Sequence, residues 1–264
     1  MKPQKIAIKN NKLYNHKRNS HQKNLKKKLT NFNYYDFLHT GNYVDYYLRR
    51  NNDDRPEYFQ SQYFENSSVC DYGCHNGNFS FALFEKFHDI IKRYDGIDVQ
   101  NECILNAQKA LVQKVKDPTH NKIDYTKLFF QLGNWVDDND ICESVSTGEY
   151  NVILVLSVLK WIHLYHGDKG VKRFLQRVYN RLLPNGYLFI EPQERQSYIK
   201  TVKEFSGFIE ENYKGLHIDP ENLKPHLEEI GFHFVNIVKS KKHGQSFNRE
   251  ILLFQKTTKI ENPH

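Results

Sequence analysis

Asp71-Tyr72-Gly73-Cys74-His75-Asn76-Gly77 is the stretch that decides the fold, because it follows one short apolar run and precedes another that ends at Asp98. The first glycine lets the chain turn sharply after a strand, and the second lets backbone approach a ligand. An acid about 20 residues further on can accept both hydroxyls of a ribose. The layout is typical of the first half of a nucleotide-binding α/β fold, and it predicts a ligand that carries adenosine.

The glycine spacing narrows the choice of ligand. A dinucleotide site needs three glycines as G-x-G-x-x-G to admit a pyrophosphate, whereas only Gly73 and Gly77 are present here. Between them, His75 and Asn76 leave little room for a diphosphate but can border the amino-acid end of S-adenosylmethionine. The motif favours a methyltransferase; taken alone, a chance turn between a strand and a helix is the alternative.

Composition sets the broad class of protein. The chain has 264 residues, 39% of them hydrophobic and 14% aromatic, which is enough for one sizeable core and an added lobe. No apolar run approaches the roughly 20 residues of a membrane span, and no apolar stretch follows the charged N-terminal residues. We therefore expect a soluble, non-secreted protein with no membrane partner.

The cysteines lack paired C-x-x-C spacing, so neither zinc nor a disulfide is expected, and a reducing compartment fits. They are Cys70, Cys74, Cys103 and Cys142. His163 and His166 have a spacing that invites a metal, but no third ligand stands nearby in the sequence. We predict no metal site.

Positive charge is concentrated at the N-terminus. Residues 1–33 hold ten Lys or Arg and no acid, which leaves 28 cations against 31 acids in the rest of the chain. Such a segment cannot bury enough apolar surface to fold alone, and we expect a disordered basic tail. Lys26-Lys27-Lys28 is either a nuclear localisation element, a phosphate-neutralising arm or merely solvated tail.

Hydrophobic periodicity predicts an α/β domain. Apolar runs typical of strands lie at 67–71, 94–99, 128–131, 150–156, 187–191, 230–238 and 250–255, and helical stripes lie at 79–87, 103–116 and 170–183. An αβ repeat that ends in a β-hairpin gives a mixed seven-stranded sheet with one antiparallel strand and helices on both faces. This is the Rossmann-like architecture of class I methyltransferases.

Two further segments carry candidate ligand contacts. Tyr43, Tyr46, Tyr47 and Arg50 share one helical face, which packs on the core in the ordinary case and lines a site in the functional one. Gly133-Asn134-Trp135 follows the third strand, where an amide can bond an adenine and an aromatic ring can pack on it.

Laid side by side, these segments resemble the methylphosphate capping enzymes, the Bicoid-interacting type of RNA methyltransferase. The resemblance covers roughly residues 39–256. It is carried by Gly41-Asn42-Tyr43 with Tyr46-Tyr47 and Arg50, Asp71-Tyr72-Gly73-Cys74, Gly133-Asn134-Trp135, Leu156-Ser157, Lys160-Trp161-Ile162-His163-Leu164, Gly167-Asp168, Glu191-Pro192-Gln193 and Ser197-Tyr198.

The resemblance implies a 5′-phosphate O-methyltransferase of small noncoding RNAs that uses S-adenosylmethionine and releases S-adenosylhomocysteine. The residues expected to line the cofactor are Arg50, Asp71, Gly73, Cys74, His75, Gly77, Asp98, Val99, Asn134, Trp135 and Leu156. Those expected toward the RNA are Tyr43, Tyr46, Lys160, Trp161, His163, Glu191 and Gln193. One departure is His75, because the family usually has Asn after the motif cysteine.

The chemistry assigns roles on the RNA side. A terminal phosphate has a second pKa of about 6, so no strong general base is required and the protein must mainly align the reacting atoms. We expect Lys160 and His163 to hold the phosphate, with the face of Tyr43, Tyr46 and Tyr47 closing over it. The alternative for Lys160 is a structural strand end. Glu191 either orders Tyr or Arg donors or is a simple strand-end carboxylate.

The resemblance also implies partners: a small noncoding RNA bound through its 5′ end, a La-related protein and other ribonucleoprotein subunits. Nuclear residence is expected, with the cytoplasm as the alternative. Two other functions stay open, a ribonucleoprotein subunit that binds and protects RNA and a methyltransferase for small molecules or proteins. The expected division is a tail at 1–33, a methyltransferase domain at 34–258 and a short tail at 259–264.

Overall fold

A computed structural model describes residues 46–50, 53–136, 148–205, 208–239 and 249–257. They belong to one compact unit, Tyr43–His264. The predicted tails at 1–33 and 259–264, Tyr43 and Cys142 lie outside the described residues. Within the described part, no helix has both the length and the apolar character needed to cross a membrane.

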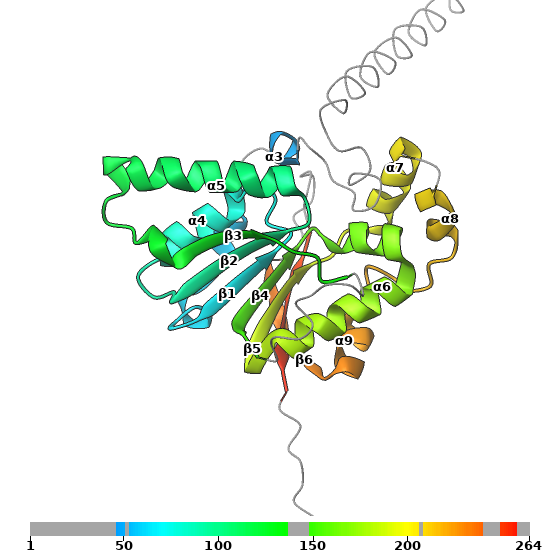
Figure 1. Ribbon diagram of the computed structural model, residues 1–264. Helices are drawn as coiled ribbons and strands as arrows, with labels where there is room; N and C mark the ends of the chain where they lie inside the picture. The colour runs from blue at the N-terminus through cyan, green and yellow to red at the C-terminus, as the bar shows by residue number, and fades with distance from the viewer. Residues whose placement is uncertain (1–45, 51–52, 137–147, 206–207, 240–248, 258–264) are drawn as a thin grey trace, which may run out of the picture. The chain divides into compact units, whose positions relative to one another are not determined.

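The described strands form a seven-stranded mixed sheet in the order β3-β2-β1-β4-β5-β7-β6 (Figure 1). Strands β1 to β5 are parallel, and β7 is antiparallel to both of its neighbours. The strands are β1 (Ser68–Tyr72), β2 (Arg93–Asp98), β3 (Leu128–Leu132), β4 (Tyr150–Leu156), β5 (Leu182–Glu191), β6 (Phe232–Lys239) and β7 (Ile251–Lys256). The predicted sheet, including its one reversed strand, is confirmed.

Helices cover both faces of this sheet, as predicted (Figure 1). On one face lie α4 (Asn78–Phe87) and α5 (Asn101–Lys116), and on the other lie α6 (Leu159–Arg181) and α9 (Lys224–Ile230). Successive side chains of a strand point to opposite faces, so Val152 and Leu154 of β4 join the α4–α5 core while Ile153 and Val155 join the α6–α9 core. A central strand covered on both faces therefore needs the continuous apolar run seen in the sequence.

Two boundaries differ from the prediction. The helix expected at 170–183 begins at Leu159, and its two halves meet at non-helical backbone at Gly167. Strand β5 begins at Leu182 rather than at the expected residue 187, and it includes Pro184-Asn185-Gly186. The pairing of β5 with β4 shifts register between Tyr150 and Val152, and such an irregularity allows a proline within a sheet.

Helices α7 (Arg195–Phe205) and α8 (Phe208–Lys214) follow β5, and the sequence analysis did not predict them. With the first half of α6 they enclose a small separate core of Leu164, Tyr165, Tyr198 and Ile209. This is the added lobe that the chain length allows. The remaining short elements are α3 (Tyr46–Arg49) and four 3-10 turns at Arg55–Tyr58, Ser61–Tyr63, Pro118–His120 and Tyr125–Lys127.

Candidate cofactor and substrate site

The glycine turn after β1 packs directly on the turn after β4. Gly73 has φ +82°, and a Cβ built on it would stand 2.2 Å from Cγ2 of Val158. Gly77, with φ +77°, begins α4, and a Cβ there would stand 2.7 Å from the Phe130 ring. Any side chain at either position would collide with a neighbour. The two turns lie at the point where the strand order reverses, which is where open α/β sheets bind ligands.

Asp98 connects this turn to the next one. Its carboxylate, at the end of β2, accepts the N–H of His75 at 2.8 Å and the N–H of Gln100 at 2.8 Å. Burial raises the pKa of Asp98, although the bonds from Gln100 and His75 oppose that shift. Each carboxylate oxygen has a second lone pair, so Asp98 can also accept the hydroxyls of a ribose.

Polar groups in the glycine turn fit S-adenosylmethionine. Oδ1 of Asn76 is buried and has no hydrogen-bond partner within the described part of the chain. A buried amide oxygen needs a donor, and S-adenosylmethionine offers an ammonium, an amine and two hydroxyls. We conclude that the residues present are compatible with this cofactor.

All predicted cofactor residues lie on segments at the carboxyl edge of the parallel strands. Asp71, Gly73, Cys74, His75 and Gly77 belong to the end of β1 and its turn, Asp98 and Val99 to the end of β2, Asn134 and Trp135 to the segment after β3, Leu156 to the end of β4, and Arg50 to the segment after α3. The structure thus brings them to one edge, while each individual contact with the cofactor stays a prediction.

The Trp135 ring lies in the core. It is 2% exposed, its centroid is 4.7 Å from that of Tyr72, and the guanidinium carbon of Arg181 is 4.6 Å from it. The Trp135 backbone N–H donates to the Tyr72 hydroxyl at 2.9 Å. Beside it, Asn134 accepts the N–H of Val136 at 2.9 Å. The predicted packing of this ring on an adenine is not tested by these contacts.

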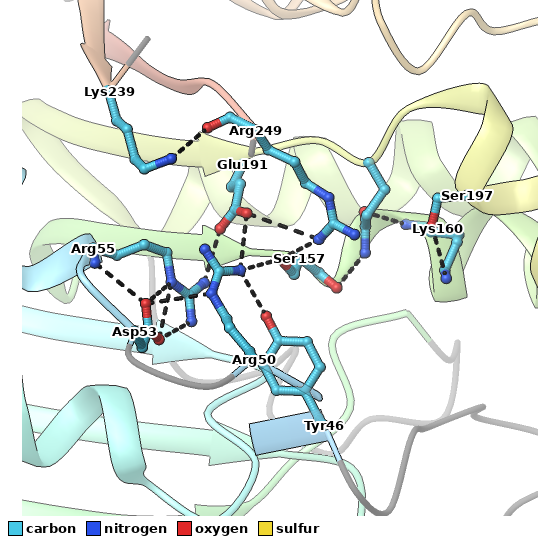
Figure 2. Close-up of polar contacts among 11 residues, drawn as sticks. Tyr46, Arg50, Asp53, Arg55, Ser157, Lys160, Glu191, Ser197, Lys239 and Arg249 are labelled. Carbon is cyan, nitrogen blue, oxygen red and sulfur yellow. Dashed lines mark hydrogen bonds and ion pairs between the residues drawn. The ribbon is translucent and has the colours of Figure 1, made fainter. Parts of the chain in front are cut away.

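A buried charge cluster lies at the end of β5, and we call it the Glu191 cluster: Arg50, Asp53, Arg55, Glu191 and Arg249 (Figure 2). Glu191 is fully buried. Its carboxylate accepts Arg55 Nη1 at 2.8 Å and Arg50 Nη1 at 3.1 Å, and Arg249 Nη1 lies 3.8 Å away. Asp53 pairs with Arg55 at 2.6 Å and with Arg50 at 3.3 Å. Glu191 therefore orders Arg donors, the first of its two predicted roles.

Electrostatics keep Glu191 charged. Burial alone would raise the pKa of Glu191, but Arg55, Arg50 and Arg249 together hold that pKa below its usual value. Burial also works against charge on the arginines, yet the acids raise the pKa of Arg50 and Arg55 overall. Three guanidinium charges face two carboxylates, so the cluster carries one surplus positive charge.

Ser157 joins the cluster to the turn after β4. It has a left-handed backbone, φ 65°, and its hydroxyl accepts Arg249 Nη1 at 2.8 Å and Arg50 Nη1 at 3.5 Å. The Ser157 carbonyl accepts the side-chain amide of Gln193, whose oxygen in turn accepts the Lys160 N–H at 3.0 Å. The turn that abuts Gly73 is thus fixed by the same residues that hold the charges.

The aromatic face predicted around Arg50 is present where it is described. The Tyr46 hydroxyl accepts Arg50 Nη1 at 3.0 Å, as the i, i+4 spacing allows. The Tyr47 hydroxyl accepts the N–H of Phe79 at 3.3 Å, and its ring centroid lies 5.5 Å from that of His75. Helix α3 therefore lies against the glycine turn.

Lys160 and His163 are buried at the start of α6 and contact the lobe. The Lys160 ammonium donates to Ser197 Oγ at 3.2 Å (Figure 2). It also donates to Thr201 Oγ1 at 2.7 Å, and both hydroxyls belong to α7. His163 Nε2 lies 2.7 Å from Asp168 Oδ1, and Nδ1 lies 3.3 Å from the Tyr198 hydroxyl. Burial lowers the pKa of His163, although Asp168 opposes that shift. These contacts attach α7 to α6, and the predicted phosphate contacts are not tested by them.

Asp53, Arg55 and Arg249 were missed by the sequence analysis. Arg55 and Glu191 are 136 residues apart, and no local pattern links them. The position of Arg249 just before the antiparallel strand β7 could have indicated that it lies at the ligand-binding edge of the sheet. Among the described residues, no three His, Cys, Asp or Glu side chains are grouped so that they could hold a metal.

The fold and this edge define a class I S-adenosylmethionine-dependent methyltransferase. A solved S-adenosylmethionine-dependent methyltransferase from Methanosarcina mazei matches 76% of this chain and 95% of its own with a TM-score of 0.54 and 18% identity. The N-methyltransferase NodS from Bradyrhizobium japonicum, in complex with S-adenosylhomocysteine, matches 84% and 97% with a TM-score of 0.53 and 17% identity. At these identities the likeness shows the fold. A family model described as a methyltransferase domain also matches residues 70–188.

The chain belongs to the Bicoid-interacting protein 3 (Bin3) family, whose model matches residues 150–256. It is 32% identical over 227 residues to the U6 snRNA methylphosphate capping enzyme Amus of Drosophila melanogaster, covering 82% of this chain and 74% of that one. It is 27% identical over 271 residues to the human 7SK snRNA methylphosphate capping enzyme, covering 82% of this chain but 39% of the human one.

Proposed function

We propose that this protein transfers a methyl group from S-adenosylmethionine to the 5′-terminal phosphate of a small noncoding RNA. The observation that carries the proposal is the placement of a buried, positively charged cluster beside the glycine turn and Asp98 at one edge of the sheet. The Drosophila relative's name, a methylphosphate capping enzyme, supports the same reaction. The match spans only 39% of the human relative's length, so the proposal concerns this domain's chemistry.

The reaction is an in-line displacement. The cofactor, when bound, supplies a methyl carbon on a sulfonium, and a phosphate oxygen forms the new O–C bond as the C–S bond breaks, which leaves S-adenosylhomocysteine. No proton has to move, because a terminal phosphate with a second pKa of about 6 is mostly ionised at neutral pH. The protein therefore acts by alignment, which can supply roughly 7 to 11 kcal/mol in favourable cases.

The predicted residues divide into two groups in this reaction. Asp98 binds the ribose hydroxyls, and the glycine turn borders the amino-acid end of the cofactor. Tyr46 lies on the RNA side with Lys160 and His163, and the predicted Tyr43 lies outside the described residues. For Lys160 to hold a phosphate, its ammonium must leave Ser197 and Thr201.

The second candidate function, an RNA-binding subunit that works without catalysis, is less well supported because the relatives are named as capping enzymes. Retention in a particle is compatible with catalysis. We propose a nuclear ribonucleoprotein with a La-related protein, in which the basic segment 1–33 precedes a catalytic domain at 34–258. Deleting residues 1–33 should weaken RNA binding and flatten its salt dependence; an unchanged slope would remove that role from the segment.

Asp98→Asn tests the proposed function. An amide cannot accept both backbone N–H groups and a ribose, because one of its two polar atoms is a donor. We expect affinity for S-adenosylhomocysteine to fall by at least about tenfold, measured by calorimetry, together with loss of labelled methyl transfer to an RNA with a 5′-monophosphate. Asp124→Asn, at an exposed 3-10 turn, is the control. Unchanged affinity and transfer in Asp98→Asn would contradict the proposal.

A further inference from the structure

Strand β7 is antiparallel to β5, so the residues just before β7 lie at the ligand-binding edge of the sheet. In a parallel strand the same residues would lie at the opposite edge. Leu252 pairs with Ile190, the residue before Glu191. The first residues of β7 therefore lie at the carboxyl edge of β5. Arg249, two residues before β7, reaches Ser157 there, and its carbonyl accepts Lys239 Nζ at 3.3 Å from the end of β6 (Figure 2).

Arg249 differs from the two other arginines of the Glu191 cluster. Arg55 and Arg50 lie 2.8 Å and 3.1 Å from Glu191, whereas Arg249 lies 3.8 Å away. Asp53 pairs with Arg50 and Arg55. The side chain of Arg249 is 13% exposed, against 5% for Arg50 and 2% for Arg55. Arg249 is thus the most accessible of the three and is the weakest bound to Glu191.

The charge balance around Arg249 favours an anion. Burial lowers the pKa of Arg249, and the neighbouring Arg50 and Arg55 lower it further, although Glu191 and Tyr46 oppose them. The pKa of Arg50 and of Arg55 moves the other way. An added anion beside Arg249 would compensate the surplus positive charge and the loss of hydration.

The position of Arg249 also suits methyl transfer. Its Nη1 donates to the Ser157 hydroxyl, and Ser157 precedes Val158, which abuts the glycine turn at Gly73. A phosphate bound by Arg249 next to the Ser157 hydroxyl would therefore lie beside the amino-acid end of a cofactor bound at that turn. A guanidinium fork matches phosphate oxygens in pairs and fixes their orientation.

We propose that Arg249, with the Ser157 hydroxyl, binds the 5′-terminal phosphate of the substrate RNA. This inference rests on the proposed function and adds to it the residue that recognises the substrate's charge. Arg50 and Arg55 hold Glu191, and Glu191 with them positions Arg249.

The test compares two RNAs of one sequence, with a 5′-monophosphate or a 5′-hydroxyl, bound to the full chain. The wild type should bind the phosphorylated RNA at least about tenfold more tightly, since bonds to charged groups contribute that much. Arg249→Gln should abolish this preference, and Arg249→Lys, which keeps the charge without the fork, should retain part of it. Affinity for S-adenosylhomocysteine, measured by calorimetry, should stay within about twofold in both variants.

Arg93→Gln is the matched control, because Arg93 begins β2 at the opposite edge of the sheet and its side chain is 56% exposed. It should keep the phosphate preference. A full preference in Arg249→Gln would overturn the inference. A loss of affinity for S-adenosylhomocysteine without a loss of the phosphate preference would also overturn it, because Arg249 would then bind the cofactor carboxylate. If Arg249→Gln fails to fold, the Lys variant decides: a wild-type preference there contradicts the inference.

These outcomes are distinct from failure of the proposed function. Methyl transfer by the wild type to a phosphorylated RNA, with an unchanged preference in Arg249→Gln, would remove Arg249 and keep the function. Absence of wild-type transfer to any phosphorylated RNA would remove the function itself, and the inference with it.

Discussion

The Glu191 cluster and the Lys160–His163 region both bury cations next to the turn after β4, but they compensate the charge differently. In the Glu191 cluster, arginines from both ends of the described chain converge on carboxylates. On α6, the Lys160 ammonium contacts the neutral hydroxyls of Ser197 and Thr201, and His163 pairs with Asp168. The first arrangement holds fixed charge close to the cofactor turn, whereas the second attaches a lobe to the sheet.

Arg249 and Lys160 would therefore bind a phosphate in different ways. Arg249 already lies against Ser157, so an incoming phosphate could bind it without rearrangement of α7. Lys160 would first have to give up its contacts with α7. Preorganised charge costs less reorganisation when the substrate arrives. Substitutions in the two regions should therefore have different consequences.

Glu191→Gln should have the largest effect on stability. It removes the carboxylate that holds three buried guanidiniums together, and breaking a buried charge network typically costs about 3–5 kcal/mol. Urea unfolding measures the change in the free energy of unfolding. Glu228→Gln is the control, because Glu228 pairs with Lys224 on the surface of α9, where an ion pair contributes about 0–1 kcal/mol. Equal effects of the two substitutions would contradict this view of the cluster.

The same cluster predicts a pH dependence. The folded-state pKa of Glu191 lies below its ordinary value of 4.5, so the ionised form favours the folded state. The sign follows: this contribution is fully present above about pH 4.5 and is lost as the pH falls through the lower, folded-state pKa. Unfolding followed from pH 6 to pH 3 should show a steeper loss of stability in the wild type than in Glu191→Gln; parallel curves would contradict it.

Lys160→Met should have a smaller effect. The buried Thr201 hydroxyl and the half-buried Ser197 hydroxyl each lose the ammonium that donates to them, at a cost of about 1–3 kcal/mol, and the methionine fills most of the volume. We expect turnover to fall because α7 loses an attachment to α6, while the preference for a 5′-phosphate over a 5′-hydroxyl remains. Lys203→Met, exposed on α7, controls for the loss of charge. Loss of the phosphate preference in Lys160→Met would assign the phosphate to Lys160 and weaken the case for Arg249.

His163→Gln should give the smallest effect, visible mainly in its pH dependence. The folded-state pKa of His163 lies below 6.5 because of burial, so the neutral ring favours the folded state. Its contribution is present above about pH 6.5 and is lost as the pH falls through the folded-state pKa. The stability difference between wild type and His163→Gln should therefore shrink on acidification. His233→Gln, on the exposed side of β6, is the matched control for removal of an imidazole.

Local patterns in the sequence were sufficient for the sheet and the cofactor turn. The run 150–156, the two glycines and Asp98 each follow from rules that act over a few residues, and the contact between Tyr46 and Arg50 follows from helical spacing. The predicted start of this strand at residue 187 was wrong, because β5 begins at Leu182 and a register shift allows Pro184 inside it. The Glu191 cluster could not be found in this way, since its members are brought together only by the order of the strands.

The sequence also could not tell where a side chain points. The phosphate contact of Lys160 stays a prediction, and its ammonium lies against α7, a helix that the sequence analysis did not predict. Arg249 lies two residues before β7, and only the antiparallel direction of β7 brings it to Ser157. Direction and tertiary contact, rather than residue type, decide what each of these cations contacts.

The most direct test of the account is transfer of labelled methyl from S-adenosylmethionine to one short RNA prepared with a 5′-triphosphate, a 5′-monophosphate or a 5′-hydroxyl. We predict label on a phosphorylated end and none on the hydroxyl, with the label retained on a methylphosphate after digestion. Absence of label from all three RNAs, with cofactor and RNA both still bound, would contradict the account and favour an RNA-binding subunit.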